Sequence, residues 1–185
     1  MPSWEEIYEL CIEVSRQVKD SGYRPDVVVA IANGGLVPAR IIADFIDQLN
    51  ILVVKIKFYA GPGQKLEKPE LVVPIQVDLH GSKVLIVDDV ADTGESLIVA
   101  VDHVESKGAG EVRTATLFYK PWSKIKPDFY AKETEEWIIF PWERIETLRM
   151  LYDKLKREGQ SREDALLALK RIGYKEDLLR WVSGP

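Results

Sequence analysis

Apolar and polar positions follow two rhythms along the chain, one typical of helices and the other of buried strands. Between residues 3 and 20, apolar side chains recur at spacings of three and four, which predicts an amphipathic helix. Ser3 fits its N-cap, and Glu6 completes a capping box. In the run DVVVAIA at 26–32, every residue after Asp26 is apolar. Such a continuous apolar run is typical of a strand that is buried on both faces of a parallel sheet.

Strand and helix patterns then alternate. Further strands are expected at 51–58, 83–89 and 111–119, and further helices at 36–49 and 94–107. Strands that alternate with helices indicate βαβ units. The predicted fold class is therefore α/β, with a mainly parallel twisted sheet flanked by helices.

Residues 59–82 interrupt this alternation. The first half is rich in Gly, Pro and Lys, and the second half is a short interrupted β segment. A long excursion inside a compact α/β domain is typically a functional lid or binding loop.

The end of the chain has a purely helical pattern. Helices are expected at 143–157, 161–173 and about 175–182. The sequence thus predicts a core at 1–143 and a C-terminal helical extension at 144–185. From Glu143 onward the chain carries ten basic and eight acidic residues, a mixture typical of a packed or oligomer-forming segment rather than a DNA-binding arm.

Composition narrows the function classes. The 185 residues include 25 Lys and Arg against 30 Asp and Glu, so the formal net charge is 25 − 30 = −5. Hydrophobic residues make up 46%, which supplies a core and excludes global disorder. The acidic balance gives no support to nucleic acid as a partner.

Cysteine content and hydropathy bear on the compartment. Cys11 is the single cysteine, which excludes an intramolecular disulfide and a cysteine-based zinc site and fits a reducing cytoplasm. No apolar run approaches the roughly 20 residues that span a bilayer. The N-terminus lacks the basic and apolar regions of a signal peptide. The expected location is the cytoplasm, with no membrane partner.

The segment VLIVDDVADTGES at 84–96 carries the strongest chemical signal. An apolar strand delivers Asp88 and Asp89 to the carboxyl edge of the sheet, where α/β folds bind ligands. A turn through Gly94 then leads into a helix, whose N-terminal N–H groups attract phosphate. Such a site suits a sugar phosphate, with the two carboxylates facing sugar hydroxyls or a hydrated Mg²⁺.

A purely structural alternative exists for this segment, namely a strand–helix junction in which Asp92 is an ordinary N-cap. That alternative accounts for Asp92 and Thr93 but leaves the adjacent acids Asp88 and Asp89 unexplained.

VLIVDDVADTGES resembles the thirteen-residue phosphoribosyl-pyrophosphate (PRPP) signature of type I phosphoribosyltransferases, and the resemblance extends from about residue 22 to 143. It implies that Asp88 and Asp89 hold the ribose hydroxyls and that Asp89 meets the Mg²⁺ cofactor, through water. It also implies a 5′-phosphate cradle of five consecutive residues: Asp92, Thr93, Gly94, Glu95 and Ser96. Glu95 is expected to point away to solvent, because the phosphate favours a neutral neighbour.

The segment IANGGLVPAR is similar to the loop that receives pyrophosphate in this family, which places Asn33, Gly34 and Gly35 in that subsite. Close relatives carry a basic residue at the position of Asn33. Either backbone N–H groups suffice here, or another cation, Arg40 or Lys65, supplies the charge. The structural alternative is a plain helix-starting turn.

The excursion at 59–82 is similar to the family's mobile hood over PRPP, whose closure would exclude water from a reactive sugar cation. Within it, Lys65 is the first candidate to reach pyrophosphate and Lys68 the second. Both lysines also fit ordinary solvated surface positions.

Two later segments concern the acceptor base. TLFYKP places Lys120 at the end of a strand, where its ammonium can donate to an exocyclic oxygen but would be unfavourable against an amino group. EEWIIFPWE presents Trp137 to stack on a planar base and the backbone of Ile138 to bind the base edge. These segments resemble the 6-oxopurine branch of the family, particularly bacterial xanthine-guanine phosphoribosyltransferases. The alternatives are a surface lysine and a core or interface tryptophan.

The resemblance implies transfer of the phosphoribosyl group from PRPP to N9 of a 6-oxopurine, which yields a nucleoside 5′-monophosphate and pyrophosphate. Asp92 would take or share the proton at purine N7, with Asp88 and Asp89 beside the developing cation. A homodimer or homotetramer is expected. An enzyme acting on adenine or another base, and a regulatory protein that binds PRPP or nucleotide, remain alternatives.

Overall fold

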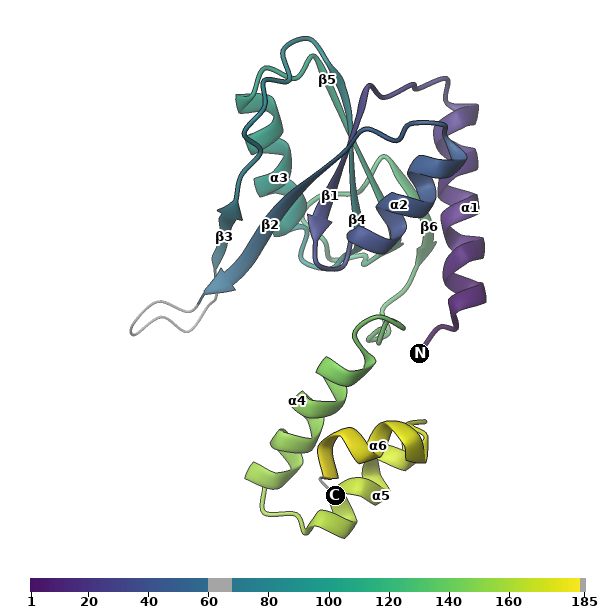
Figure 1. The fold of residues 1–185 in the computed structure, drawn as a ribbon, viewed down its shortest axis with the longest axis vertical. Coiled ribbons are helices and arrows are strands. Elements are labelled where there is room, and N and C mark those ends of the chain that lie inside the picture. Colours follow the sequence, from purple (N-terminus) through teal and green to yellow (C-terminus); the bar gives the residue numbers. More distant parts are fainter. Residues whose placement is uncertain (60–67, 184–185) are drawn as a thin grey trace. The chain divides into compact units, whose positions relative to one another are not determined.

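The computed structural model describes residues 1–59 and 68–183 (Figure 1). The chain divides into two compact units, one formed by Trp4–Glu136 and the other by Met1–Ser3 with Trp137–Pro185. The larger unit ends at Glu136. The sequence predicts that the core ends later, at residue 143.

The larger unit is built on one six-stranded sheet with the strand order β3-β2-β1-β4-β5-β6. All neighbouring strands are parallel except β2 and β3, which are antiparallel. The α/β class and the mainly parallel sheet are therefore confirmed. The strands are β1 Val27–Ala32, β2 Ile51–Tyr59, β3 Lys68–Val73, β4 Lys83–Ala91, β5 Glu111–Tyr119 and β6 Phe129–Glu133.

Helices cover both faces of this sheet. α1 (Trp4–Asp20) and α2 (Leu36–Phe45) lie on one face, and α3 (Glu95–Ser106) lies on the other (Figure 1). On the α3 face, alternate residues of β1, β2 and β4 pack against the helix in one apolar core that includes Val29, Val54, Ile86, Leu97 and Val104. The continuous apolar runs of the central strands reflect this two-sided burial.

The structure differs from the sequence-based prediction in three elements. Residues 68–73, expected to lie in the excursion at 59–82, form the edge strand β3 antiparallel to β2. α2 ends at Phe45 rather than near 49, because Ile46 is its C-cap and Asp47 turns into the left-handed region with φ 57°. The strand β6 was not predicted. It is a short edge strand whose last residues, Lys132 and Glu133, are exposed, so it lacks the apolar run of a buried strand.

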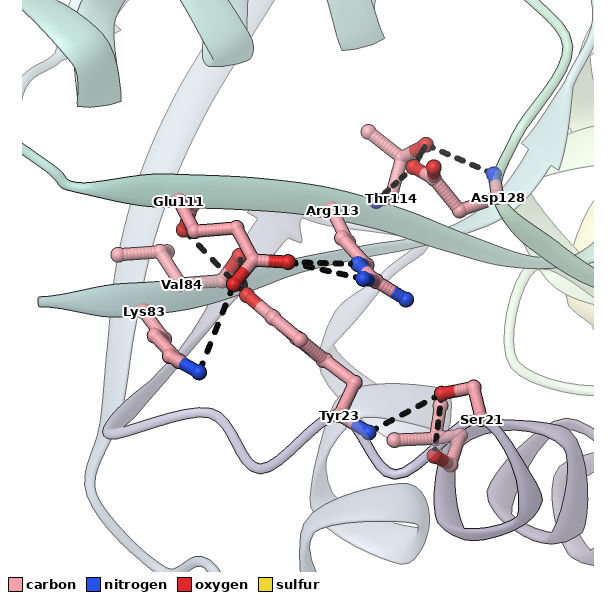
Figure 2. Close-up of polar contacts among 9 residues, drawn as sticks. Ser21, Tyr23, Lys83, Val84, Glu111, Arg113, Thr114 and Asp128 are labelled. Carbon is pink, nitrogen blue, oxygen red and sulfur yellow. Dashed lines mark hydrogen bonds and ion pairs between the residues drawn. The ribbon is translucent and has the colours of Figure 1, made fainter.

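The amino ends of β4 and β5 are tied together by a cluster around Tyr23 and Arg113 (Figure 2). The single proton of the Tyr23 hydroxyl is shared between two carbonyl oxygens, that of Val84 at 2.9 Å and that of Glu111 at 3.3 Å. The Arg113 guanidinium lies 4.5 Å from the Tyr23 ring centroid and pairs with the Glu111 carboxylate at 2.9 Å. Burial, with Glu111 nearby, raises the pKa of the Tyr23 hydroxyl. This edge of the sheet is thus fixed by structural contacts.

Removing the Tyr23 hydroxyl should cost stability. We expect Tyr23→Phe to lower the free energy of unfolding by about 1–2 kcal/mol, because two carbonyl groups lose a buried donor. Urea denaturation measures this as a lower midpoint at unchanged slope. Tyr8→Phe is the matched control, because Tyr8 is 45% exposed on α1, and it should change stability by no more than about 0.5 kcal/mol. Equal effects of the two substitutions would contradict the role given to the Tyr23 hydroxyl.

The smaller unit contains the three helices that the pattern predicts: α4 Arg144–Arg157, α5 Arg162–Arg171 and α6 Glu176–Ser183. Their core consists of Leu148, Leu169, Tyr174 and Leu179. Ser161 caps α5 by accepting a hydrogen bond from the Asp164 N–H at 3.1 Å. Among the described residues, no helix is long and apolar enough to cross a membrane.

Candidate active site

Two adjacent carboxylates lie at the carboxyl edge of β4. Asp88 and Asp89 are each only 8% exposed, and the Asp89 N–H donates to the Asp88 Oδ1 at 3.0 Å. Burial, and after it the charge of Asp89, raises the pKa of the Asp88 carboxyl well above its usual range. Sugar hydroxyls or a cation at this position would favour the ionised form of the pair. The arrangement is therefore suited to a polyhydroxylated ligand with a metal ion.

The loop after β1 packs directly onto these acids. A Cβ added at Gly34 would overlap the Asp89 carboxyl group, and one at Gly35 would overlap the Val87 carbonyl oxygen and lie 2.8 Å from that of Ile31. At Gly35 the obstacle is backbone, so only glycine fits there, whereas at Gly34 a side chain would displace the Asp89 carboxylate. A plain helix-starting turn would not need such an approach, so the structure brings the glycine pair and the acid pair into one site.

The turn between β4 and α3 forms the other wall. Gly94 is the N-cap of α3 with φ 79°, and the first N–H of the helix, that of Glu95, donates to the Thr93 Oγ1 at 3.4 Å. The alternative in which Asp92 is an ordinary N-cap is therefore wrong. The strand end and the turn line a cavity of about 310 Å³. Its lining residues are Phe58, Asp88, Asp89, Val90, Ala91, Asp92, Thr93, Gly94, Ser96 and Leu97.

Glu95 is the first residue of α3 and does not line the cavity. Its Oε1 is 2.5 Å from the Lys124 Nζ, and its side chain is only 26% exposed. Glu95 therefore points away from the cavity, and it is paired with the exposed Lys124 rather than free in solvent. The Lys124 N–H also donates to the Thr93 carbonyl at 3.0 Å. The segment after β5 thus braces the turn Asp92–Gly94, called the phosphate turn below, and the Lys124 ammonium offsets the charge of Glu95.

Asp92 is held by a residue that the sequence did not indicate. The Trp122 indole N–H donates to the Asp92 Oδ1 at 3.0 Å. The ammonium of Lys120 lies 5.4 Å from the Trp122 ring centroid. Lys120 is only 4% exposed, and it donates to the Glu136 carbonyl. Trp122 thus contacts both groups: its indole N–H binds the Asp92 carboxylate, and its ring lies near the buried ammonium of Lys120. An exposed tryptophan in a loop carries no motif by which sequence reasoning finds it.

The residues expected to supply positive charge for pyrophosphate differ in their surroundings. Arg40 forms an exposed ion pair with Asp44 at 3.2 Å. Lys65 lies outside the described residues, and Lys68 is exposed at the start of β3. The cation next to Asn33 is Lys55 on β2, whose Nζ donates to the Asn33 Oδ1 at 3.5 Å.

Comparison with known proteins decides the family. The sequence profile of the phosphoribosyl transferase domain matches residues 3–144. The chain belongs to this phosphoribosyltransferase family. It is 31% identical to a xanthine-guanine phosphoribosyltransferase of Cereibacter sphaeroides, over 76% of this chain and 84% of that one. A similar enzyme of Nitratidesulfovibrio vulgaris is 30% identical, with 76% and 82% covered.

Solved structures of phosphoribosyltransferases share the fold. A purine phosphoribosyltransferase from Pyrococcus horikoshii superposes with a TM-score of 0.69 at 36% identity, over 76% of this chain and 91% of that one. A xanthine-guanine-hypoxanthine phosphoribosyltransferase from Helicobacter pylori superposes with a TM-score of 0.67 at 26% identity, over 80% and 96%.

The acids of this phosphoribosyltransferase fit a magnesium ion that the substrate helps to hold. Within residues 1–59 and 68–183, no group of three or more His, Cys, Asp or Glu side chains is placed to bind a metal by itself. Mg²⁺ is commonly bound by one or two carboxylates, with water and substrate phosphates completing its shell. Asp88 and Asp89 form such a partial set.

Two expected base-binding residues belong to the other compact unit. Trp137 is 62% exposed, and with Ile138 it falls in the unit that begins at Trp137. Their part in base binding stays a prediction.

Proposed function

We propose that this protein transfers the 5-phosphoribosyl group from PRPP to N9 of a 6-oxopurine in purine salvage, forming a nucleoside 5′-monophosphate and pyrophosphate. The observation that carries the proposal is the convergence of the glycine pair, the acid pair and the phosphate turn on one edge of the sheet. Support also comes from the names of relatives, which are xanthine-guanine and hypoxanthine-guanine phosphoribosyltransferases.

PRPP would lie across the carboxyl edge of β1 and β4. The 5′-phosphate would bind Asp92, Thr93, Gly94, Glu95 and Ser96 through the turn N–H groups, the helix N-terminus and the hydroxyls. Asp88 and Asp89 would accept hydrogen bonds from the ribose hydroxyls and hold Mg²⁺, chiefly through Asp89. When bound, Mg²⁺ would neutralise charge on the leaving pyrophosphate.

The purine would approach from the Lys120 side. The ammonium of Lys120 would donate to O6, which a 6-oxopurine offers and adenine does not. Asp92 would accept the proton at N7 as N9 attacks the ribose carbon. The two buried acids would stabilise positive charge that develops on the sugar. Holding purine N9, the ribose carbon and the leaving pyrophosphate in line would account for much of the rate enhancement.

Three further properties belong to this proposal. Catalysis requires Mg²⁺, the protein acts in the cytoplasm, and it works as a homodimer or homotetramer. The partners are PRPP and the purine base, and the acidic net charge of −5 gives no support to nucleic acid.

The experiment that tests the proposal is nucleotide formation from PRPP and guanine, with product identified by mass spectrometry. We expect GMP and pyrophosphate in equal amounts with Mg²⁺, loss of both in excess EDTA, and recovery when Mg²⁺ is restored. Tight binding of PRPP or nucleotide without turnover would favour the regulatory alternative instead.

The contact between Trp122 and Asp92 leads to a separate prediction. Trp122→Phe keeps an aromatic ring beside Lys120 but removes the N–H that orients the carboxylate. We expect kcat to fall roughly tenfold, as for a lost hydrogen bond to a charged group, while the KM for PRPP stays nearly unchanged. In an Asp92→Asn background the same substitution should have almost no further effect on kcat. Independent, additive losses would contradict the positioning role.

A further inference from the structure

The loop that would receive pyrophosphate carries no charge of its own. It consists of Asn33, Gly34 and Gly35, and it lies against the buried carboxylate of Asp89. A diphosphate group placed there would face a nearby acid and no cation from the loop. A bound Mg²⁺ would offset part of this charge, but a further cation next to the loop would be favourable.

Lys55 lies next to the loop Asn33–Gly35, where such a cation would be favourable. It lies opposite Ala32 in the parallel register of β1 and β2, so it is adjacent to the point where the loop leaves the strand. Its neighbours Val54 and Ile56 are buried in the core on the α3 face. Because side chains alternate along a strand, Lys55 projects to the opposite face, where the loop leads into α2.

The contacts of Lys55 leave its charge available. Its ammonium donates to the Asn33 Oδ1 at 3.5 Å, a long hydrogen bond to a neutral group. Within the part of the chain that the structure describes, no carboxylate forms a salt bridge with it. Arg40, by contrast, is paired with Asp44. A lysine stem is flexible and its ammonium has three donors, so it can bind Asn33 and an anion together.

We propose that Lys55 is the cation of the pyrophosphate subsite, with Asn33 orienting its ammonium toward a diphosphate oxygen. The charge that the loop lacks at Asn33 is supplied from the neighbouring strand. This inference rests on the proposed function, because it assigns a residue to the same site.

Pyrophosphate itself is the probe for the test. We expect Lys55→Met to raise the Kd for pyrophosphate, measured by calorimetry with Mg²⁺ present, roughly tenfold to a hundredfold. The Kd for GMP, which leaves this subsite empty, should change less than about twofold, within the scatter of surface substitutions. Lys57→Met is the matched control on the same strand and face, and it should leave both constants unchanged.

Two variants separate a lost charge from a damaged fold. Lys55→Arg keeps the charge and should retain most of the pyrophosphate affinity. Asn33→Arg in the Lys55→Met background should recover part of it, because it restores a cation from the loop side. Unchanged pyrophosphate affinity in Lys55→Met, or equal losses for pyrophosphate and GMP, would overturn the assignment. A wild-type protein that binds pyrophosphate through Lys55 but forms no nucleotide would instead defeat only the proposed function.

Discussion

Asp92→Asn lowers kcat roughly 10²- to 10⁴-fold, the range that a lost general base typically costs. The substitution keeps the shape of the side chain and an oxygen that can accept from the Trp122 indole N–H. The phosphate turn is therefore expected to stay in place. The KM for PRPP should rise no more than about threefold, because the lost interaction acts in the transition state.

Steady-state kinetics with PRPP and guanine measures this split between kcat and KM. Asp102→Asn is the matched control, because Asp102 is an exposed residue of α3, and it should leave both parameters unchanged. Full activity in Asp92→Asn would show that another group accepts the purine proton.

Gly34→Ala should nearly abolish activity while the fold survives, and Gly35→Ala should destabilise the fold itself. The atoms that each new methyl group meets explain the difference. At Gly34 the methyl meets the end of the Asp89 side chain, which can rotate away, but rotation removes the carboxylate from the site. At Gly35 it meets backbone carbonyls of β4 and β1, which cannot move without displacing both strands.

Thermal unfolding and kinetics together test this contrast. We expect Gly35→Ala to lower the free energy of unfolding by about 1–3 kcal/mol or more, the usual cost of overpacking. The loss for Gly34→Ala should be smaller than this by at least about 1 kcal/mol. Gly159→Ala is the control for a loop glycine, because its Cβ would meet nothing within 4 Å, although its φ of 84° makes a small stability cost expected. Its kinetic constants should be those of the wild type. A fully active Gly34→Ala variant would contradict the close approach of the loop to Asp89.

Much of this site follows from sequence because its parts are local. The run at 84–96 places two acids at the end of an apolar strand and a glycine at the helix start; in the structure both acids lie near the end of β4 and Gly94 is the N-cap of α3. The apolar runs of β1, β4 and β5 are equally local signals. Each of these inferences needs only neighbouring residues.

The parts that sequence reasoning missed depend on pairings between distant segments. Lys55 meets the loop at Asn33 only because β2 lies beside β1 in one register, which no local pattern specifies. Trp122 reaches Asp92, and Lys124 reaches Glu95, only because the segment after β5 folds back over the phosphate turn.

The most direct test of the central claim is an assay of PRPP and Mg²⁺ with xanthine, guanine, hypoxanthine and adenine in turn, with the nucleoside 5′-monophosphates quantified. A buried ammonium at Lys120 predicts product with 6-oxopurines and little or none with adenine. Product with adenine alone, or with none of the four bases, would contradict the proposed function.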